Sequence, residues 1–211
     1  HPRVRRQRQM CIRDRNMKNR LEQMMGVEFR EAATAIPPGI ISGNVKVISN
    51  VVESVGLDVV NVIDEPTAAA SVLGITDGAV VDVGGGTTGI SILKDGKVVF
   101  TADEPTGGTH MTLVLAGSLG CTFEEAERIK KDPKQEVLVF PVVKPVIEKM
   151  AAIVSRFIQG YDVDVIYVVG GACSFKKFES VFEKETGIKT IKPKEPLLVT
   201  PLGIAMNCNR Q

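Results

Sequence analysis

The chain has 211 residues, of which 44% are hydrophobic and 24% charged, and its formal net charge is +1. These values are typical of a globular protein with one large or two small domains, and they give no general reason to expect a nucleic-acid or strongly acidic partner. No apolar run approaches the roughly 20 residues of a membrane-spanning helix, and no signal-peptide pattern opens the chain. The four cysteines are scattered and form no C-x-x-C pair, so we expect a reducing, cytoplasmic location.

The first fifteen residues differ in composition from the rest of the chain. They are dense in arginine and lack an apolar period, which is typical of a basic tail for nucleic acid or a membrane surface. The run from Gln7 to Arg15 instead resembles translated sequencing-adaptor sequence. We therefore predict that residues 1–15 are a non-native tail that carries no information on the fold.

The segment from Asn16 onward alternates helical and strand patterns. Pro66 stands in the first turn of an expected helix, where its missing N–H costs nothing, and small residues at 68–71 let that helix approach another backbone closely. The pattern predicts a short helix through Met17 and Leu21, a strand at 31–36, a helix from Asn44 to Gly56, a strand at 59–63 and a helix at 64–74.

The stretch 79–93 predicts a buried strand, a tight turn and a second strand. Asp82 ends the first strand, and the turn consists of Gly84, Gly85, Gly86, Thr87 and Thr88. Backbone N–H groups without Cβ atoms form an anion-binding concavity, and a carboxylate beside them could hold a divalent cation or its bound water. The stretch thus suggests a Mg²⁺–phosphate site, with a β-hairpin that binds nothing as the alternative. No lysine and no helix follow the glycines, which excludes the P-loop and the dinucleotide fingerprint.

The second half of the chain predicts one more strand and then mostly helices. Gly107 and Gly108 open a helix whose N–H groups could face a second anion. Thr122 and Glu125 form a capping box. The other expected elements are a strand at 97–102, helices at 123–131 and 141–159, a strand at 163–169, a helix capped by Ser174, a strand near Ile191 and a helix from Pro201.

Four segments together resemble a known superfamily. They are Asp-Glu-Pro-Thr-Ala-Ala-Ala (64–70), Asp-Val-Gly-Gly-Gly-Thr-Thr (82–88), Val-Val-Gly-Gly (168–171) and Pro-Leu-Gly-Ile-Ala (201–205). In this order they resemble the actin-like ATPases, which include DnaK-type chaperones, sugar kinases and bacterial actins. The runs 32–39, 103–112 and 197–205 resemble the ethanolamine-utilisation branch of that superfamily, and the resemblance extends from about Asn16 to the end.

The resemblance implies an α/β fold of the actin-like ATPase (ribonuclease H-like) type, with two lobes around a nucleotide cleft. Residues 16–77 would be a partial first lobe, completed by a hinge helix in 197–211, and 78–196 would be the second lobe. The superfamily's leading Asp-x-Gly-Thr hairpin does not occur in this sequence. The first lobe is therefore expected to be incomplete, and ATP hydrolysis by this chain stays open.

The resemblance also assigns roles to individual residues around ATP or ADP and Mg²⁺. Asp82 would hold the Mg²⁺ through water and, with Glu65, position the attacking water. The glycines and threonines of 84–88 would form the second phosphate hairpin. The adenosine would lie against Glu127, Lys130, Gly170 and Gly171.

Each of these roles has a plainer alternative. Glu127 and Lys130, one helical turn apart, could be a surface ion pair, and Gly170 and Gly171 a bare turn. The resemblance places Gly203 and Ala205 in the hinge helix, where small residues allow close crossing. His110 and Cys173 have no sequence partner for catalysis and are interpreted as structural.

The function that the resemblance implies is that of an ATP-binding, chaperone-like protein of ethanolamine utilisation. Nucleotide would close the lobes, and the partners would be proteins of the pathway or its microcompartment, with no nucleic acid and no membrane. The first alternative is a scaffold that has the fold without turnover. A small-molecule kinase is less expected, because the short links leave little room for a substrate-binding insertion, and a filament former stays open.

Overall fold

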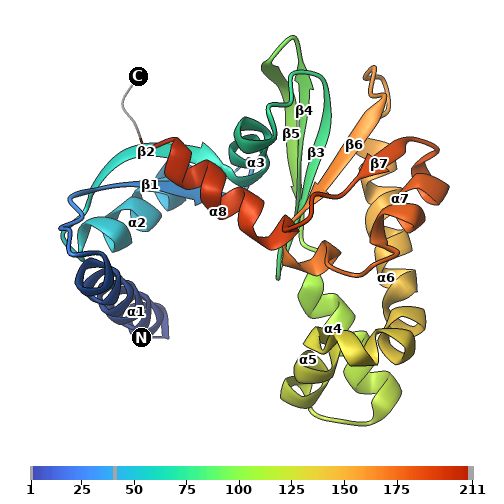
Figure 1. Cartoon of the computed structure of the whole chain (residues 1–211), viewed down its shortest axis with the longest axis horizontal. Helices are drawn as coiled ribbons and strands as arrows, with labels where there is room; N and C mark the ends of the chain where they lie inside the picture. Colours follow the sequence, from blue (N-terminus) through green and yellow to red (C-terminus); the bar gives the residue numbers. More distant parts are fainter. Residues whose placement is uncertain (1, 40–41, 209–211) are drawn as a thin grey trace.

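A computed structural model of the chain describes residues 2–39 and 42–208. Residues 1 and 209–211, the outer ends of the predicted tail and hinge segments, lie outside the described residues. Within the described ranges the strands form two sheets, one two-stranded and one five-stranded. Figure 1 shows the small sheet with α1 and α2 on one side of the molecule and the large sheet with α4 to α7 on the other. No helix in these ranges is both long and apolar enough to cross a membrane.

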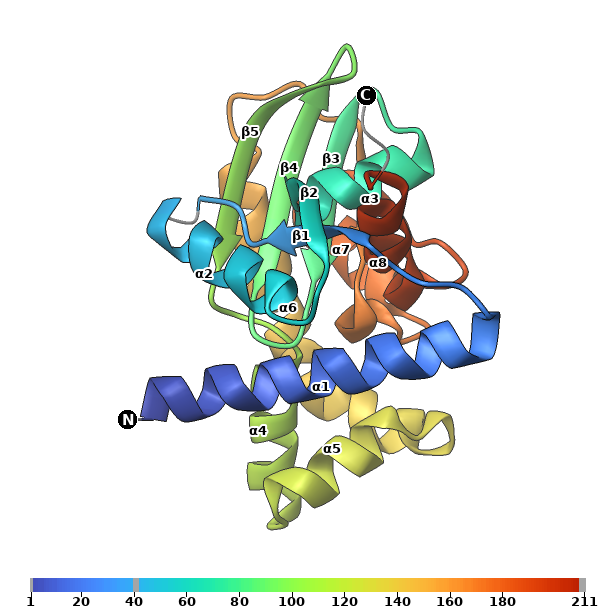
Figure 2. The ribbon, with the colours of Figure 1, turned by 90° about the vertical axis from the view of Figure 1, so that its left-hand side faces the viewer.

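The small sheet pairs β1 (Glu31–Ile36) with β2 (Asp58–Asp64) in parallel. Parallel neighbours need a crossover, and α2 (Ser42–Glu53) supplies it. Both strands confirm the predicted ones, whereas α2 begins before Asn44 and ends before Gly56. Helix α1 (Pro2–Met25) runs through the predicted tail, for which no element was expected, and lies beside α2 (Figure 2).

The large sheet has the strand order β5-β4-β3-β6-β7. Its centre is β3 (Gly78–Val83), antiparallel to β4 (Thr88–Lys94) and parallel to β6 (Val165–Val169). The outer strands are β5 (Lys97–Glu104) and β7 (Lys189–Ile191). Strands β3 and β6 end side by side, with Asp82 paired to Val169. The sheet therefore delivers Asp82 to the same edge as the glycines that follow β6.

Alternation along β3 sorts its residues onto two faces. Val81 and Val83 belong to the main core, which α4 (Gly108–Leu119), α6 (Glu136–Phe157) and α7 (Phe178–Thr186) complete. Val80 packs on the opposite face with residues of α3 (Glu65–Leu73) and α8 (Pro196–Met206). Because side chains alternate along a strand, Asp82 shares the α8 face with Val80.

Two helix starts on the large sheet differ from the prediction. Helix α6 begins at Glu136, upstream of Pro141, where the sequence predicts the helix to start. It therefore contains both Pro141 and Pro145, although proline lacks the N–H that a helix interior uses. The buried valines and isoleucines of α6 pack into the core on both sides of the prolines and keep the helix continuous. Ser174 caps no helix: its hydroxyl donates to the Gly171 carbonyl at 2.8 Å, and α7 begins at Phe178.

The remaining helix of the large sheet matches its expected bounds. Helix α5 (Phe123–Lys131) begins with the predicted capping box, in which Thr122 and Glu125 exchange hydrogen bonds. A short 3₁₀ turn at Pro133–Gln135 connects α5 to α6, and a second one at Gly171–Cys173 follows β6.

Helices α3 and α8 join the two sheets (Figure 1). Asp64 caps α3 by accepting the Thr67 N–H at 3.0 Å, and α3 ends at Gly74, as predicted. A Cβ on Gly203 would overlap the Ala68 carbonyl, so the helices cross at backbone contact, as the resemblance implied. Ala205 is exposed and takes no part in this crossing.

Candidate functional site

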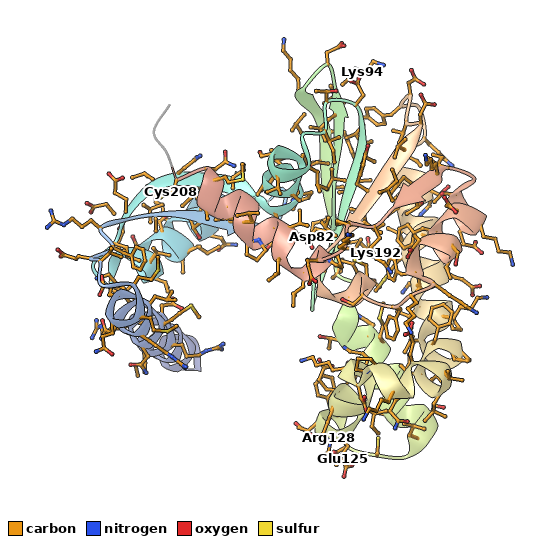
Figure 3. All side chains as sticks on the ribbon, viewed as in Figure 1. Asp82, Lys94, Glu125, Arg128, Lys192 and Cys208 are labelled. Atoms are coloured by element: carbon orange, nitrogen blue, oxygen red, sulfur yellow. The ribbon has the colours of Figure 1, made fainter. Side chains whose placement is uncertain are left out.

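A cavity of about 640 Å³ opens at the edge of the large sheet where β3 and β6 end. Figure 3 places Asp82 at the junction of the sheet and α8. The predicted site residues that line the cavity are Asp82, Gly84, Gly85, Gly108, Glu127, Lys130, Gly170 and Gly171. Those that do not are Glu65, Gly86, Thr87, Thr88 and Gly107.

The β3–β4 hairpin presents bare backbone beside this cavity. The turn is closed by the Gly84 N–H, which donates to the Thr87 carbonyl at 3.0 Å. Gly85 and Gly86 do not have positive φ, and a Cβ on either would meet nothing within 4 Å. Neither conformation nor packing within the chain therefore requires glycine here. In the described part of the chain, the N–H groups of Gly85 and Gly86 donate to no acceptor, which suits an anion.

The start of α4 holds the hairpin instead of facing a second anion. The N–H groups of Gly108 and Thr109 donate to the carbonyls of Gly84 and Gly85 at 2.9 and 2.8 Å. The Gly107 N–H donates to His110 Nδ1 at 3.2 Å, so His110 is a structural residue, as interpreted from the sequence. A Cβ on Gly107 would come within 2.8 Å of the hairpin backbone. These glycines thus allow close packing, and their N–H groups are not free for a ligand.

Asp82 is a buried carboxylate, with 7% of its surface exposed. Its Oδ2 accepts a hydrogen bond from the Thr200 hydroxyl at 2.5 Å. Among the described residues no lysine or arginine forms an ion pair with it, and burial raises its pKa although the Thr200 hydrogen bond opposes the shift. A buried carboxylate without a cation is a costly arrangement that a bound cation would relieve.

Gly170 and Cys173 surround Asp82 from the β6 side. Gly170 has φ +91°, and a Cβ there would overlap Asp82 Oδ1 and the Val83 carbonyl. The glycine is therefore required both by conformation and by the approach of the carboxylate. The Cys173 thiol donates to the Gly170 carbonyl at 3.0 Å, and burial raises its pKa to about 12. Cys173 is thus an inert, structural thiol, as interpreted from the sequence.

A group of carboxylates lies beside Asp82 outside the cavity lining. Burial first, then the negative charges of Asp82, Asp103 and Asp64, raise the pKa of Glu65 to about 7. In the described ranges no three His, Cys, Asp or Glu residues come close enough to ligate a metal directly. A Mg²⁺ ion would therefore fit here as a largely hydrated ion beside Asp82, the coordination that Mg²⁺ favours.

The hydroxyls of the two hairpin threonines, Thr87 and Thr88, form hydrogen bonds within the protein. Thr88 donates to the Thr106 carbonyl at 2.6 Å, and Thr87 forms a hydrogen bond with Asp103. Their hydroxyls hold the hairpin to the segment that leads into α4. In this structure neither faces the cavity as a ligand donor.

Glu127 and Lys130 form the wall of the cavity opposite the sheet. Lys130 Nζ lies 2.7 Å from Glu127 Oε2 and also donates to the Gly108 carbonyl at 2.9 Å and to Thr112 Oγ1 at 2.7 Å. The Lys130 side chain is only 11% exposed. The pair is therefore not a surface ion pair: it ties α5 to the start of α4, and through that start to the hairpin.

Comparisons with known proteins place this chain in a family. Ethanolamine utilization protein EutJ of Salmonella typhimurium is 46% identical over 186 residues, which are 88% of this chain and 65% of that protein. The Escherichia coli protein of the same name is 45% identical over the same shares. The crystal structure of EutJ from Carboxydothermus hydrogenoformans matches 95% of this chain and 74% of its own, with 50% identity and a TM-score of 0.89. This chain belongs to the EutJ family.

The fold of this chain also resembles that of more distant proteins. The family of type IV pilus assembly protein PilM matches residues 66–197. The structure of a PilM–PilN type IV pilus biogenesis complex has a TM-score of 0.67 at 17% identity, over 79% of this chain and 58% of its own, and shows the fold alone. The predicted actin-like ATPase fold is thereby confirmed. The chain spans about 65% of the length of the curated relatives it matches.

The sequence pattern did not predict several residues of the cavity. Thr200 and Leu197 lie in a run that we had quoted, but the helix was expected to start only at Pro201, so their side chains could not be placed. Thr112 was also missed: it does not line the cavity but bonds to Lys130 and Glu127 behind the wall, and it stands four residues after Gly108, a spacing that brings it onto the same helix face. The other lining residues that sequence reasoning missed are Lys131, Asp132, Pro133, Glu136, Ala172, Ser174 and Phe175.

Glu127 in the wall of the cavity is expected to make a pH-dependent contribution to stability. Burial acts to raise the pKa of Glu127, but hydrogen bonds from Lys130, Thr112 and Lys131 outweigh it and lower the pKa to about 2. A carboxyl with a depressed folded-state pKa stabilises the fold above its unfolded pKa, near 4.5, and this contribution disappears as the pH falls towards 2.

Glu127→Gln is therefore expected to lower the free energy of unfolding by about 1–2 kcal/mol at pH 7. The difference from the wild type should shrink steadily below pH 4.5. Urea unfolding of both proteins between pH 7 and pH 3 measures it, with Glu124→Gln at an exposed position of the same helix as control. A difference that stays constant with pH would contradict the prediction.

Proposed function

We propose that this chain carries the second-lobe half of an ATP/ADP–Mg²⁺ site. The supporting observation is that one cavity is bordered by three groups suited to a nucleotide. They are the Gly85 N–H, which donates to no acceptor in the described chain, the Asp82 carboxylate, which has no cationic partner there, and the Glu127–Lys130 ion pair. The division into a first lobe (16–77, completed by 197–211) and a second lobe (78–196) belongs to this proposal. The cavity lies entirely on the second of these lobes and on α8.

Each residue has a distinct task in this site. The Gly85 N–H group, which lies at the cavity, would bind a phosphate oxygen without reorganising, because the hairpin is already held by α4. Asp82 would orient a water of the hydrated Mg²⁺, and Mg²⁺, when bound, would neutralise phosphate charge. Glu127 and Lys130 would orient the ribose, and Gly170 and Gly171 would let the nucleoside approach the backbone.

In the cell, we propose that this site serves a chaperone-like protein of ethanolamine utilisation. The names of the relatives that match 88% of the chain support the pathway. Nucleotide binding would change the relation of the two sheets through α3 and α8, the helices that join them, and partner proteins of the pathway or its microcompartment would bind one state preferentially.

One observation favours a binding protein without turnover as the second candidate. Of the two carboxylates predicted to position the attacking water, only Asp82 lines the cavity, and Glu65 does not. Burial and neighbouring negative charges also raise the pKa of Glu65 to about 7. A site with one carboxylate at the phosphate end would bind nucleotide and release little phosphate.

Calorimetric titration of ATP and ADP, each with and without Mg²⁺, tests the proposed site. We expect binding of both nucleotides that strengthens with Mg²⁺. Phosphate release measured in the same solutions separates the ATPase from the scaffold. No binding by protein that circular dichroism shows to be folded would overturn the site, and partners captured equally with ATP and ADP would overturn the nucleotide-dependent role.

A further inference from the structure

The side chain of Asp82 is held by a residue from the far end of the sequence. Within the described part of the chain, its only side-chain hydrogen bond comes from the Thr200 hydroxyl, which donates to Oδ2 at 2.5 Å. Both residues are buried, with 7% and 8% of their surfaces exposed. Alternation along β3 directs Asp82 to the face on which α8 packs, so the contact follows from the fold.

Thr200 belongs to a helix that is fixed at three points. Near its start, the Pro196 carbonyl accepts the Gly170 N–H at 2.9 Å, so α8 is attached to the cavity edge. In its middle, Gly203 touches the backbone of Ala68 in α3. At its end, the Asn207 carbonyl accepts a hydrogen bond from Asn61 Nδ2 of β2 at 3.1 Å.

Thr200 and Gly203 are three residues apart, so they lie on one face of α8. The hydroxyl that holds Asp82 is thus one helical turn from the crossing with α3. A movement of the Asp82 carboxylate must either break the Thr200 hydrogen bond or move this turn of the helix. A displacement at the Thr200–Asp82 contact is therefore passed along α8 to the Gly203–Ala68 contact, which joins α8 to α3.

We propose that Thr200 is a positioning residue with two effects. Its hydroxyl fixes the Asp82 carboxylate with Oδ2 engaged, which leaves Oδ1, beside Gly170, as the oxygen free to orient a water of a hydrated Mg²⁺. The same hydrogen bond transmits ligand binding at Asp82 to α8 and hence to the small sheet. This inference rests on the proposed nucleotide site and adds the residue that couples it to the rest of the molecule.

A plainer role for Thr200 would be to satisfy a buried polar group and nothing more. That role predicts a change in stability alone. The positioning role also predicts changes in Mg²⁺-dependent affinity and in the response of α8 to ligand, which are separate readouts.

The test compares four variants of the whole chain. Thr200→Val removes the hydroxyl at nearly constant shape, and Thr200→Ser and Thr200→Ala form a second pair that differs only in the hydroxyl. Thr190→Val is the matched control, because Thr190 is also a buried threonine and does not line the cavity. The probe is ADP with and without Mg²⁺, followed by calorimetry and by hydrogen exchange of the α8 amides.

We expect Thr200→Val and Thr200→Ala to weaken Mg²⁺-dependent ADP binding about tenfold or more, because a hydrogen bond to a charged group is lost. Binding without Mg²⁺ should change little. The wild type should show ADP-induced protection of α8, and this protection should disappear in both variants. Thr200→Ser and Thr190→Val should retain both properties.

Two results would overturn the inference and leave the nucleotide site intact. One is a wild-type affinity and α8 protection in Thr200→Val or, where that variant does not fold, in Thr200→Ala. The other is a loss in Thr200→Ser as large as that in Thr200→Ala, which would make packing the cause. A wild-type chain that is folded and binds no ADP with Mg²⁺ would instead overturn the proposed function and this inference with it.

Discussion

Replacing Asp82 by asparagine is expected to stabilise the unliganded protein and to weaken its Mg²⁺-dependent nucleotide binding strongly. Asp82 is a buried carboxylate whose pKa is raised by burial, and in the described chain no cation pairs with it. An amide of the same shape removes the cost of the buried charge, and the Thr200 hydroxyl can still donate to its carbonyl oxygen. We expect the free energy of unfolding at pH 7 to rise by about 1–3 kcal/mol.

The same substitution removes the charge that attracts the cation. Affinity for ATP or ADP with Mg²⁺ should fall by about a hundredfold, since roughly 1.4 kcal/mol corresponds to each factor of ten and a charge-assisted contact is lost. Affinity without Mg²⁺ should fall little or rise, because a negative charge near the phosphates is gone. Thermal unfolding and calorimetric titration of one protein preparation measure both effects.

Asp162→Asn is the matched control, since Asp162 is exposed and only approaches Lys94 at 3.5 Å on the surface. It should change neither property by more than the scatter of the measurements. A substitution that raises the free energy of unfolding but lowers the affinity identifies a residue that is retained for binding. An Asp82→Asn variant that is less stable and binds Mg²⁺–ADP as the wild type does would show that Asp82 is structural.

Local signals in the sequence predicted much of the fold. The strand at 31–36 and the helix at 123–131 have the predicted bounds because their ends are marked locally, by Pro37 and by the capping box of Thr122 and Glu125. The hairpin after Asp82 and the helix between Asp64 and Gly74 follow from turn and cap chemistry in the same way. In these places one or two neighbouring residues decide the conformation.

The predictions from the sequence were wrong where contacts with distant residues outweigh the local conformational preference of the chain. Pro141 and Pro201 are favourable first residues of a helix, but buried faces extend α6 and α8 upstream of them. The N–H groups of Gly108 and Thr109 are taken by hairpin carbonyls more than twenty residues away. The Thr200 contact with Asp82 joins positions 118 residues apart, and a single sequence without relatives contains no local signal for it.

The crossing of α3 and α8 predicts the largest loss of stability from one added methyl group. A Cβ on Gly203 would overlap the carbonyl oxygen of Ala68, and this obstacle is backbone that cannot rotate away. Ala68 itself is fully buried. Gly203→Ala must therefore push the two helices apart, and we expect it to lower the free energy of unfolding by about 3 kcal/mol, the upper range for overpacking a core.

Gly117→Ala is the matched control for Gly203→Ala. Gly117 is also a helical glycine, in α4, but it is exposed and a Cβ there meets nothing within 4 Å. Because alanine is the better helix former, Gly117→Ala should raise the free energy of unfolding by about 0.5–1 kcal/mol. The same chemical change thus has opposite expected signs at the two positions, and urea unfolding measures both.

The Gly203 variant also bears on how the two sheets are connected. Where the variant remains folded, separation of α3 and α8 should weaken the Thr200 contact with Asp82, since both contacts lie on one face of α8. Mg²⁺–ADP affinity should then fall together with stability, although Gly203 does not line the cavity. Equal stabilities of Gly203→Ala and Gly117→Ala would show that the crossing has room to spare, and the close approach of these helices would then not be what joins the sheets.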